Sequence, residues 1–174
     1  MENVKAIIFD AYGTLFDVNS AAEKCKYKIG DKWESFANYW RTTQLEYTWL
    51  RSLMKRHKDF WQVTEDSLDK SMKVFNIDNS MRNELLDLYK ILSPYSEVPE
   101  VLKSLKEKKY KLSILSNGTP SLLNELVKSN NPLVLKSNLP TETHRSLFNV
   151  GNLSKTVFLF NGSFLETISL GLLL

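Results

Sequence analysis

The fold of this chain is decided by residues 7–15, which read IIFDAYGTL. The apolar run over residues 4–9 predicts a buried strand, and Asp10 stands where that strand ends. Gly13 supplies the conformational freedom for a tight turn directly afterwards. Ligands of open α/β sheets bind beyond the carboxyl ends of the strands, so Asp10 lies where chemistry is expected. An isolated aspartate after a strand is more often an ordinary turn residue, and the neighbouring residues have to decide.

Length and composition exclude several classes of protein. The 174 residues suffice for one domain, or for one domain with an insertion. A net charge of +3 gives no reason to expect nucleic acid as a partner. The single cysteine, Cys25, cannot form an internal disulfide, and no stretch approaches the ~20 apolar residues of a membrane span. Because Asp10 interrupts the apolar start before it resembles a signal peptide, we expect a cytoplasmic protein without a membrane partner.

A block of helices is predicted after the first strand. Apolar residues spaced three and four apart predict a long helix that Asp31 caps and that ends near Met54. Another helix is expected from about Thr64, its cap, and a further one over residues 79–92.

A pattern of alternating helix and strand resumes near residue 98. Pro99 marks the start of a short helix, and residues 111–115, KLSIL, predict a second buried strand. That strand ends at residues 116–119, SNGT, after which Thr119 and Pro120 open another helix.

The spacing of Asp10, Gly13 and Thr14 after an apolar strand resembles motif I of the haloacid dehalogenase superfamily. The resemblance implies that Asp10 is a nucleophile and that the Thr14 hydroxyl orients it. Phosphatases of the superfamily carry a second aspartate two residues after the first, where this chain has Tyr12. Tyr12 cannot replace a carboxylate as a ligand of Mg²⁺ or as an acid of low pKa. Residues 9–15 therefore resemble specifically the type II, L-2-haloacid dehalogenase branch.

This resemblance implies an α/β fold, namely a Rossmann-like parallel-sheet core with a helical cap domain inserted after the first strand. The expected core domain takes residues 1–15 and 95–174, and the expected cap domain takes residues 16–94. Without motif I, residues 16–94 would read equally well as helices that simply pack on a sheet.

Residues 40–51, WRTTQLEYTWLR, resemble the cap helix of the L-2-haloacid dehalogenases. The resemblance implies that Arg41 receives the departing halide and helps to orient the substrate. A guanidinium suits this role because it is permanently charged and weakly hydrated. The alternative is an ordinary solvated arginine. Thr42 stands where the family often has glutamine, which is a modest departure.

The resemblance also implies several contacts to substrate. Ser116 and Asn117 would hold the substrate carboxylate with nearby backbone amides, because hydroxyl, amide and N–H groups before a helix make an anion site. The apolar part of the substrate would lie among Tyr12, Leu45 and Phe60, with Ala11 beside the nucleophile. The alternatives are a small polar turn for residues 116–119 and core packing for the apolar side chains.

The implied reaction is hydrolytic dehalogenation of short (S)-2-haloacids to (R)-2-hydroxy acids. The Asp10 carboxylate attacks the halogen-bearing carbon, halide leaves toward Arg41, and water then hydrolyses the ester. The expected partners are a 2-haloalkanoic acid and water, and no metal or other cofactor is expected because no phosphate charge has to be neutralised.

The resemblance covers about residues 4–127 and then stops. The family should next show a lysine followed by Pro-Asp-Pro, and then a strand running into Ser-Asn-x-(Trp or Phe)-Asp. This chain has Asn149 near the expected lysine, and Lys155 comes late and lacks that context. Residues 157–160 could form a strand, but residues 161–166 are only weakly similar to the final motif. The stretch 129–174 also holds only five charged residues, so we expect a divergent tail from a frameshifted or prematurely ended reading frame.

Two other functions follow from these departures. The chain could be a non-catalytic truncated remnant or an interaction protein, because the lysine and the final aspartate are missing. Less favoured is a Mg²⁺-dependent small-molecule phosphatase, which Tyr12 opposes. The aromatic residues of the long cap helix suit a homodimer interface and a core equally well.

Overall fold

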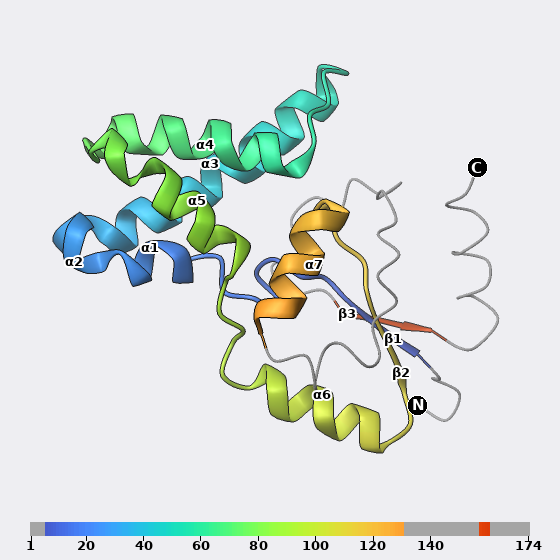
Figure 1. The fold of residues 1–174 in the computed structure, drawn as a ribbon. Coiled ribbons are helices and arrows are strands. Elements are labelled where there is room, and N and C mark those ends of the chain that lie inside the picture. The colour runs from blue at the N-terminus through green and yellow to red at the C-terminus, as the bar shows by residue number, and fades with distance from the viewer. Residues whose placement is uncertain (1–5, 131–156, 161–174) are drawn as a thin grey trace. The chain divides into compact units, whose positions relative to one another are not determined.

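The computed structural model describes residues 6–130 and 157–160 (Figure 1). These residues fall into two compact units. The core unit holds the described residues of 1–16 and 94–174, and the helical unit holds residues 17–93. Apart from residues 129–130 and 157–160, the tail predicted to be divergent lies outside the described residues.

The core unit contains a sheet with the strand order β2-β1-β3 (Figure 1). β1 (Ala6–Phe9) pairs in parallel with β2 (Lys111–Ile114), in the register Ala6 to Lys111 and Phe9 to Ile114. All four residues of β1 are buried, as the continuous apolar run predicts for a central strand. The predicted α/β core built on a parallel pair of strands is confirmed.

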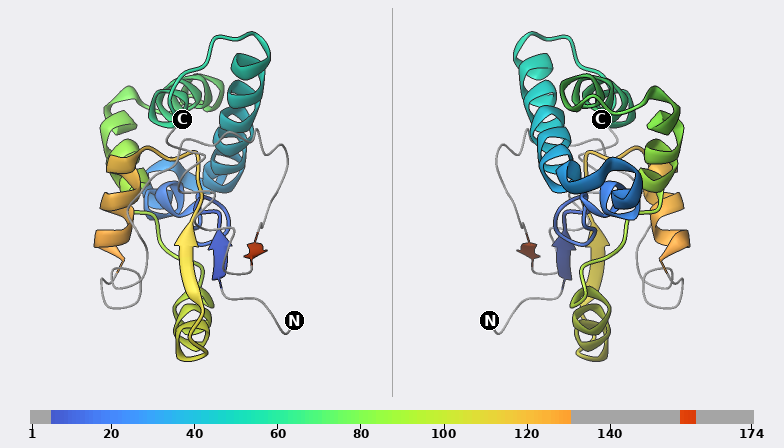
Figure 2. Two further views of the ribbon diagram at one scale, coloured as in Figure 1. Left: turned by 90° about the vertical axis from the view of Figure 1, so that its right-hand side faces the viewer. Right: turned by 90° about the vertical axis from the view of Figure 1, so that its left-hand side faces the viewer.

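The third strand runs in the opposite direction. β3 (Val157–Phe160) forms at the predicted position but pairs antiparallel with β1, so that Ala6 lies opposite Phe160. Figure 2 shows β1 between its two neighbours. An antiparallel strand beside a parallel pair is common in α/β proteins.

Two helices of the core unit begin as the sequence predicts. α6 (Val98–Glu107) carries a proline in its first turn, and α7 (Pro120–Ser129) begins at one. The Thr119 side chain caps α7 by accepting a hydrogen bond from the Leu122 amide at 3.4 Å. A proline costs nothing in a first turn, because that amide would have no helical partner. α7 buries leucines at positions 122, 123 and 126.

The helical unit is built around a hairpin of two long helices. α3 (Trp33–Leu53) packs along α4 (Phe60–Phe75), and α1 (Ser20–Lys24) contacts both α3 and α5 (Arg82–Lys90). The shorter elements are α2 (Lys26–Ile29) and the 3-10 helices η1 (Gly30–Lys32) and η2 (Asn79–Met81). None of the helices in the described part of the chain has the length and apolar character needed to cross a membrane.

Aromatic rings form much of the interior of the helical unit. Trp40 of α3 lies against Tyr89 of α5, with ring centroids 5.2 Å apart, and Phe36 meets Phe75 edge to face at 5.9 Å. The predicted apolar stripe of α3 is buried only in its first half. Leu50 and Met54, at the end of that stripe, are 52% and 57% exposed.

Two predicted helix caps are wrong. Asp31 lies inside η1 and not at the start of α3. α4 begins four residues before Thr64, and Asp59 caps it by accepting a hydrogen bond from the Gln62 amide at 2.8 Å. Thr64 is buried within the helix and donates its hydroxyl to the Phe60 carbonyl at 2.8 Å. A threonine can back-bond inside a helix in this way as readily as it can cap one, so residue type alone does not separate the two.

Replacing Asp59 by alanine should lower the free energy of unfolding by about 1 kcal/mol, because it removes the side-chain acceptor of an N-cap. Urea denaturation followed by circular dichroism measures the change. Asp31→Ala is the matched control and should stay within about 0.5 kcal/mol of wild type, as an exposed substitution. Equal losses in both variants would contradict the cap assignment.

Candidate active site

The loop after β1 is folded tightly by its own backbone. The Ala11 carbonyl accepts hydrogen bonds from the amides of Leu15 and Phe16, each at 3.0 Å, and the Gly13 amide returns a bond to the Phe16 carbonyl at 2.8 Å. Gly13 has a φ of 90°, which side chains with a Cβ rarely adopt. Asp10 therefore leaves the sheet at a closed turn that holds its backbone in place.

The loop after β2 leaves the sheet at the same edge. The Leu115 amide donates to the Phe9 carbonyl at 2.9 Å, so the parallel pairing reaches to the residue before Asp10 on one strand and before Ser116 on the other. Ser116 is buried, and its Oγ accepts a hydrogen bond from the Gly118 amide at 3.2 Å. Asn117 is exposed. The carboxyl ends of parallel strands are where ligands of such sheets bind.

Tyr12 and Gly118 join the two loops. A Cβ added to Gly118 would lie 2.7 Å from Cε2 of Tyr12 and 3.2 Å from the Tyr12 hydroxyl oxygen. Tyr12 is 4% exposed, and its ring occupies the space that a side chain at position 118 would need. The absence of a side chain at Gly118 therefore allows Tyr12 of the first loop to pack closely on the second loop.

Gly118→Ala should lower the free energy of unfolding by about 1–3 kcal/mol, because the new methyl group overpacks the Tyr12 ring. Chemical denaturation measures the loss. Tyr12→Leu removes the ring atoms that clash, so the double variant should recover part of the stability lost by the single one. No recovery would show that Tyr12 is not the residue that excludes a side chain at position 118.

The Thr14 side chain lies in the loop after β1. Its Oγ1 is buried and has no hydrogen-bond partner among the described residues. The predicted role of Thr14 in orienting Asp10 therefore stays a prediction.

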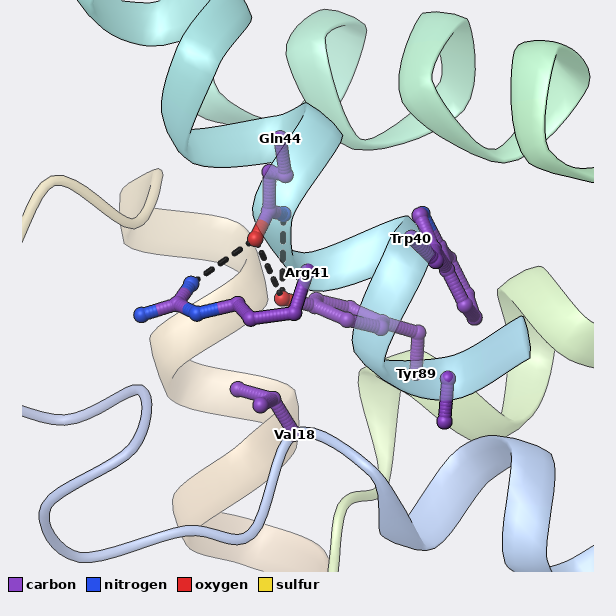
Figure 3. A pocket seen from close by; sticks show the side chains of 6 residues that line it. Val18, Trp40, Arg41, Gln44 and Tyr89 are labelled. Atoms are coloured by element: carbon purple, nitrogen blue, oxygen red, sulfur yellow. Dashed lines mark hydrogen bonds between the residues drawn. The ribbon is translucent and has the colours of Figure 1, made fainter. Parts of the chain in front are cut away.

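The helical unit holds the remaining predicted residues. Arg41 and Leu45 lie on α3 and are half-buried, and Phe60, also half-buried, is the first residue of α4. Arg41 lines a recess with Val18, Trp40 and Tyr89, and in the described structure this recess leaves no room for a water molecule (Figure 3). Asp10, Ala11, Tyr12, Ser116 and Asn117 belong to the core unit.

Gln44 is the residue that the sequence reasoning missed. Its side chain is 1% exposed, and its Oε1 accepts a hydrogen bond from Nη1 of Arg41 at 2.8 Å (Figure 3). One signal could have found it, since Gln44 stands four residues after Trp40 on the apolar face of the predicted helix. A polar side chain at such a position has to find hydrogen-bond partners inside the protein.

Two other arginines of the helical unit form ion pairs with aspartates. Arg51 binds Asp66 at 2.6 Å, and Arg82 binds Asp69, whose hydrogen bond raises the pKa of Arg82. Burial raises the pKa of the Cys25 thiol, with Glu84 adding to the effect, so the thiol is held in its neutral form. A neutral buried thiol is a poor nucleophile, so Cys25 is not a nucleophile candidate.

Comparison with known proteins places the sequence in a family. The family model of the haloacid dehalogenase-like hydrolases matches residues 4–135. An (S)-2-haloacid dehalogenase of Pseudomonas sp. (strain YL) is 44% identical over 129 residues, which cover 73% of this chain and 56% of that protein. The chain therefore belongs to the haloacid dehalogenase-like hydrolases.

Solved structures show the same fold. A dehalogenase crystal structure matches with a TM-score of 0.74 and 34% identity, over 80% of this chain and 62% of the other. The L-2-haloacid dehalogenase of Xanthobacter autotrophicus with chloropropionic acid covalently bound matches with a TM-score of 0.64 and 39% identity, over 72% of this chain and 51% of the other. The chain thus spans little more than half the length of the curated relatives it matches.

Proposed function

We propose that this chain acts in the hydrolytic dehalogenation of short (S)-2-haloacids to (R)-2-hydroxy acids, through an ester on Asp10. The main support for the proposal is the position of Asp10 in the loop after β1. Asp10 and Ser116 follow two neighbouring parallel strands at the same edge of the sheet. Tyr12, over Gly118, takes the place of the second aspartate of a phosphatase. The (S)-2-haloacid dehalogenases among the relatives support this choice of substrate.

The first half of the reaction forms the ester. A carboxylate oxygen of Asp10 bonds to the halogen-bearing carbon from the side opposite the halogen, and the carbon–halogen bond breaks with its electron pair leaving on halide. Arg41 stabilises that anion, while Ser116 and Asn117 hold the substrate carboxylate. Ala11, Tyr12, Leu45 and Phe60 contact the rest of the substrate. Thr14 is assigned to the orientation of Asp10.

The second half returns Asp10 to its starting form. Water adds to the carbonyl carbon of the ester, the 2-hydroxy acid leaves, and the carboxylate is restored. The resemblance implies that family members carry out this step with the lysine before Pro-Asp-Pro and with the last aspartate of the final motif. Neither motif occurs after residue 127 of this sequence. We therefore expect the 174-residue chain to form the ester faster than it hydrolyses it.

Mass spectrometry after exposure to L-2-chloropropionate, run beside a halide-release assay, tests the proposal. The expected result is a mass increase of one propionate unit on the peptide that contains Asp10, with about one halide released per chain. The D-enantiomer is the matched control and should leave the protein unchanged. A folded protein that shows neither adduct nor halide would overturn the proposal and favour the alternative of a non-catalytic remnant.

We further propose that the helical unit is the cap domain and that residues 1–15 and 95–174 form the core domain, which the division of the described residues near residues 16 and 94 supports. A homodimer and a cytoplasmic location stay predictions. Trp40 belongs to the interior of the helical unit, whereas Leu53, at the end of α3, is 76% exposed. Light scattering across a range of concentrations would determine the oligomeric state.

A further inference from the structure

A series of hydrogen bonds connects buried side chains of the helical unit with Arg41. Gln44 Nε2 donates to Thr64 Oγ1 at 2.6 Å and lies 3.0 Å from the Tyr89 hydroxyl, while Gln44 Oε1 accepts from Arg41 Nη1 at 2.8 Å (Figure 3). Gln44, Thr64 and Tyr89 are all buried and come from three different helices. Three helices thus converge on one side-chain amide.

In this series of hydrogen bonds, the proton donor of each bond follows from the neighbouring bond. The Thr64 hydroxyl has one proton, and it goes to the Phe60 carbonyl at 2.8 Å. Thr64 Oγ1 can therefore only accept from its other neighbour, so the group of Gln44 that faces it has to be the NH₂. The amide oxygen of Gln44 is then left on the opposite side, facing Arg41.

The partner that Gln44 offers to Arg41 is neutral. On the same helix pair, Arg51 is bound by the carboxylate of Asp66, which cancels its charge. An amide oxygen restrains the guanidinium without bringing a negative charge to it, and the partial burial of Arg41 strengthens the bond. The bond from Gln44 therefore positions the guanidinium without placing a negative charge beside it, and such a placed cation can stabilise a leaving anion.

We propose that Gln44 is a positioning residue that sets the guanidinium of Arg41 for the departing halide, with its own orientation set by Thr64. This inference rests on the proposed function and deepens it. In this proposal Gln44 acts through Arg41, to which its side chain is hydrogen-bonded.

The test measures single-turnover ester formation with 2-chloropropionate and 2-bromopropionate. Gln44→Met removes the amide and should slow the reaction on the order of 10- to 100-fold, as a misplaced catalytic group does. The loss should be larger for the chloride, because the poorer leaving group depends more on stabilisation of its developing charge. Gln44→Glu keeps the shape but brings a carboxylate to Arg41, and it should show the same bias toward bromide.

Two controls separate positioning from folding. Thr43→Val changes a buried polar residue beside Gln44 on the same helix, and it should leave the ratio of the two rates unchanged even if it lowers the unfolding midpoint. In an Arg41→Lys background, Gln44→Met should slow the reaction less than about twofold, because effects of residues that act through one another are not additive. If Gln44→Met does not fold, the same comparisons are made with Gln44→Glu.

Three results would contradict the proposed role of Gln44. A reactive wild type with an unchanged chloride-to-bromide ratio in the Gln44 variants would overturn the role of Gln44 alone. Equal losses from Gln44→Met in the wild-type and Arg41→Lys backgrounds would do the same. An unreactive, folded wild type would overturn the proposed function and this inference together.

Discussion

Asp10→Asn should abolish ester formation, lowering its rate by at least about 10⁴-fold, as loss of a nucleophile does in other covalent enzymes. The amide that replaces the carboxylate is uncharged and far less nucleophilic, while its size is almost the same. Ser116 at the same sheet edge cannot replace the carboxylate, because an un-ionised hydroxyl is a far weaker nucleophile. The variant peptide should therefore keep its mass after exposure to L-2-chloropropionate, and halide should not appear.

The control for Asp10→Asn has to exclude a general loss of structure. Asp31→Asn changes an exposed aspartate of η1 and should react at the wild-type rate. Both variants should unfold in one cooperative transition close to that of wild type. An adduct that still forms in Asp10→Asn would move the nucleophile to another residue, which peptide mapping would identify.

Arg41→Lys should slow ester formation by about 10²- to 10³-fold, the range seen when one group that stabilises a developing anion is lost. Lysine keeps the positive charge, but its ammonium group is more strongly hydrated and has no planar set of N–H donors. It also cannot hold the geometry of the present bond from Nη1 to Gln44. Stopped-flow detection of released halide measures the rate.

Arg51→Lys is the matched control for Arg41→Lys. Arg51 lies on the same helix and is paired with Asp66 at 2.6 Å, so its charge is already compensated. The substitution should change the rate less than about threefold, although it weakens a partly buried ion pair. Equal loss of rate in both variants would mean that α3 needs its arginines for folding and that Arg41 has no particular part in the chemistry.

Several features of the fold could be predicted because they depend on residues close together in the chain. The buried strand before Asp10 follows from a continuous apolar run. The turn after it follows from Gly13, which alone there can adopt a φ of 90°. The cap of α7 follows from Thr119 and Pro120, which are adjacent.

Other features escaped prediction because several residue types can serve one local role. Thr64 and Asp59 are both acceptable helix caps, and the structure shows that Asp59 caps α4 while Thr64 bonds back inside the helix. The second half of the predicted stripe of α3 is exposed at Leu50 and Met54, because helical periodicity describes a face and not what covers it.

The candidate site divides in the same way. The sequence by itself determined the nucleophile candidate Asp10, the loop that follows it and the polar turn at Ser116, since each is a short motif at the end of a strand. Only the tertiary structure decided that Tyr12 lies over Gly118, that β3 runs antiparallel to β1 and that Gln44 faces Arg41. The physical reason is that these contacts join segments far apart in the chain, or depend on such segments. The amide of Gln44 is oriented by Thr64 and Tyr89, which reach it from two other helices.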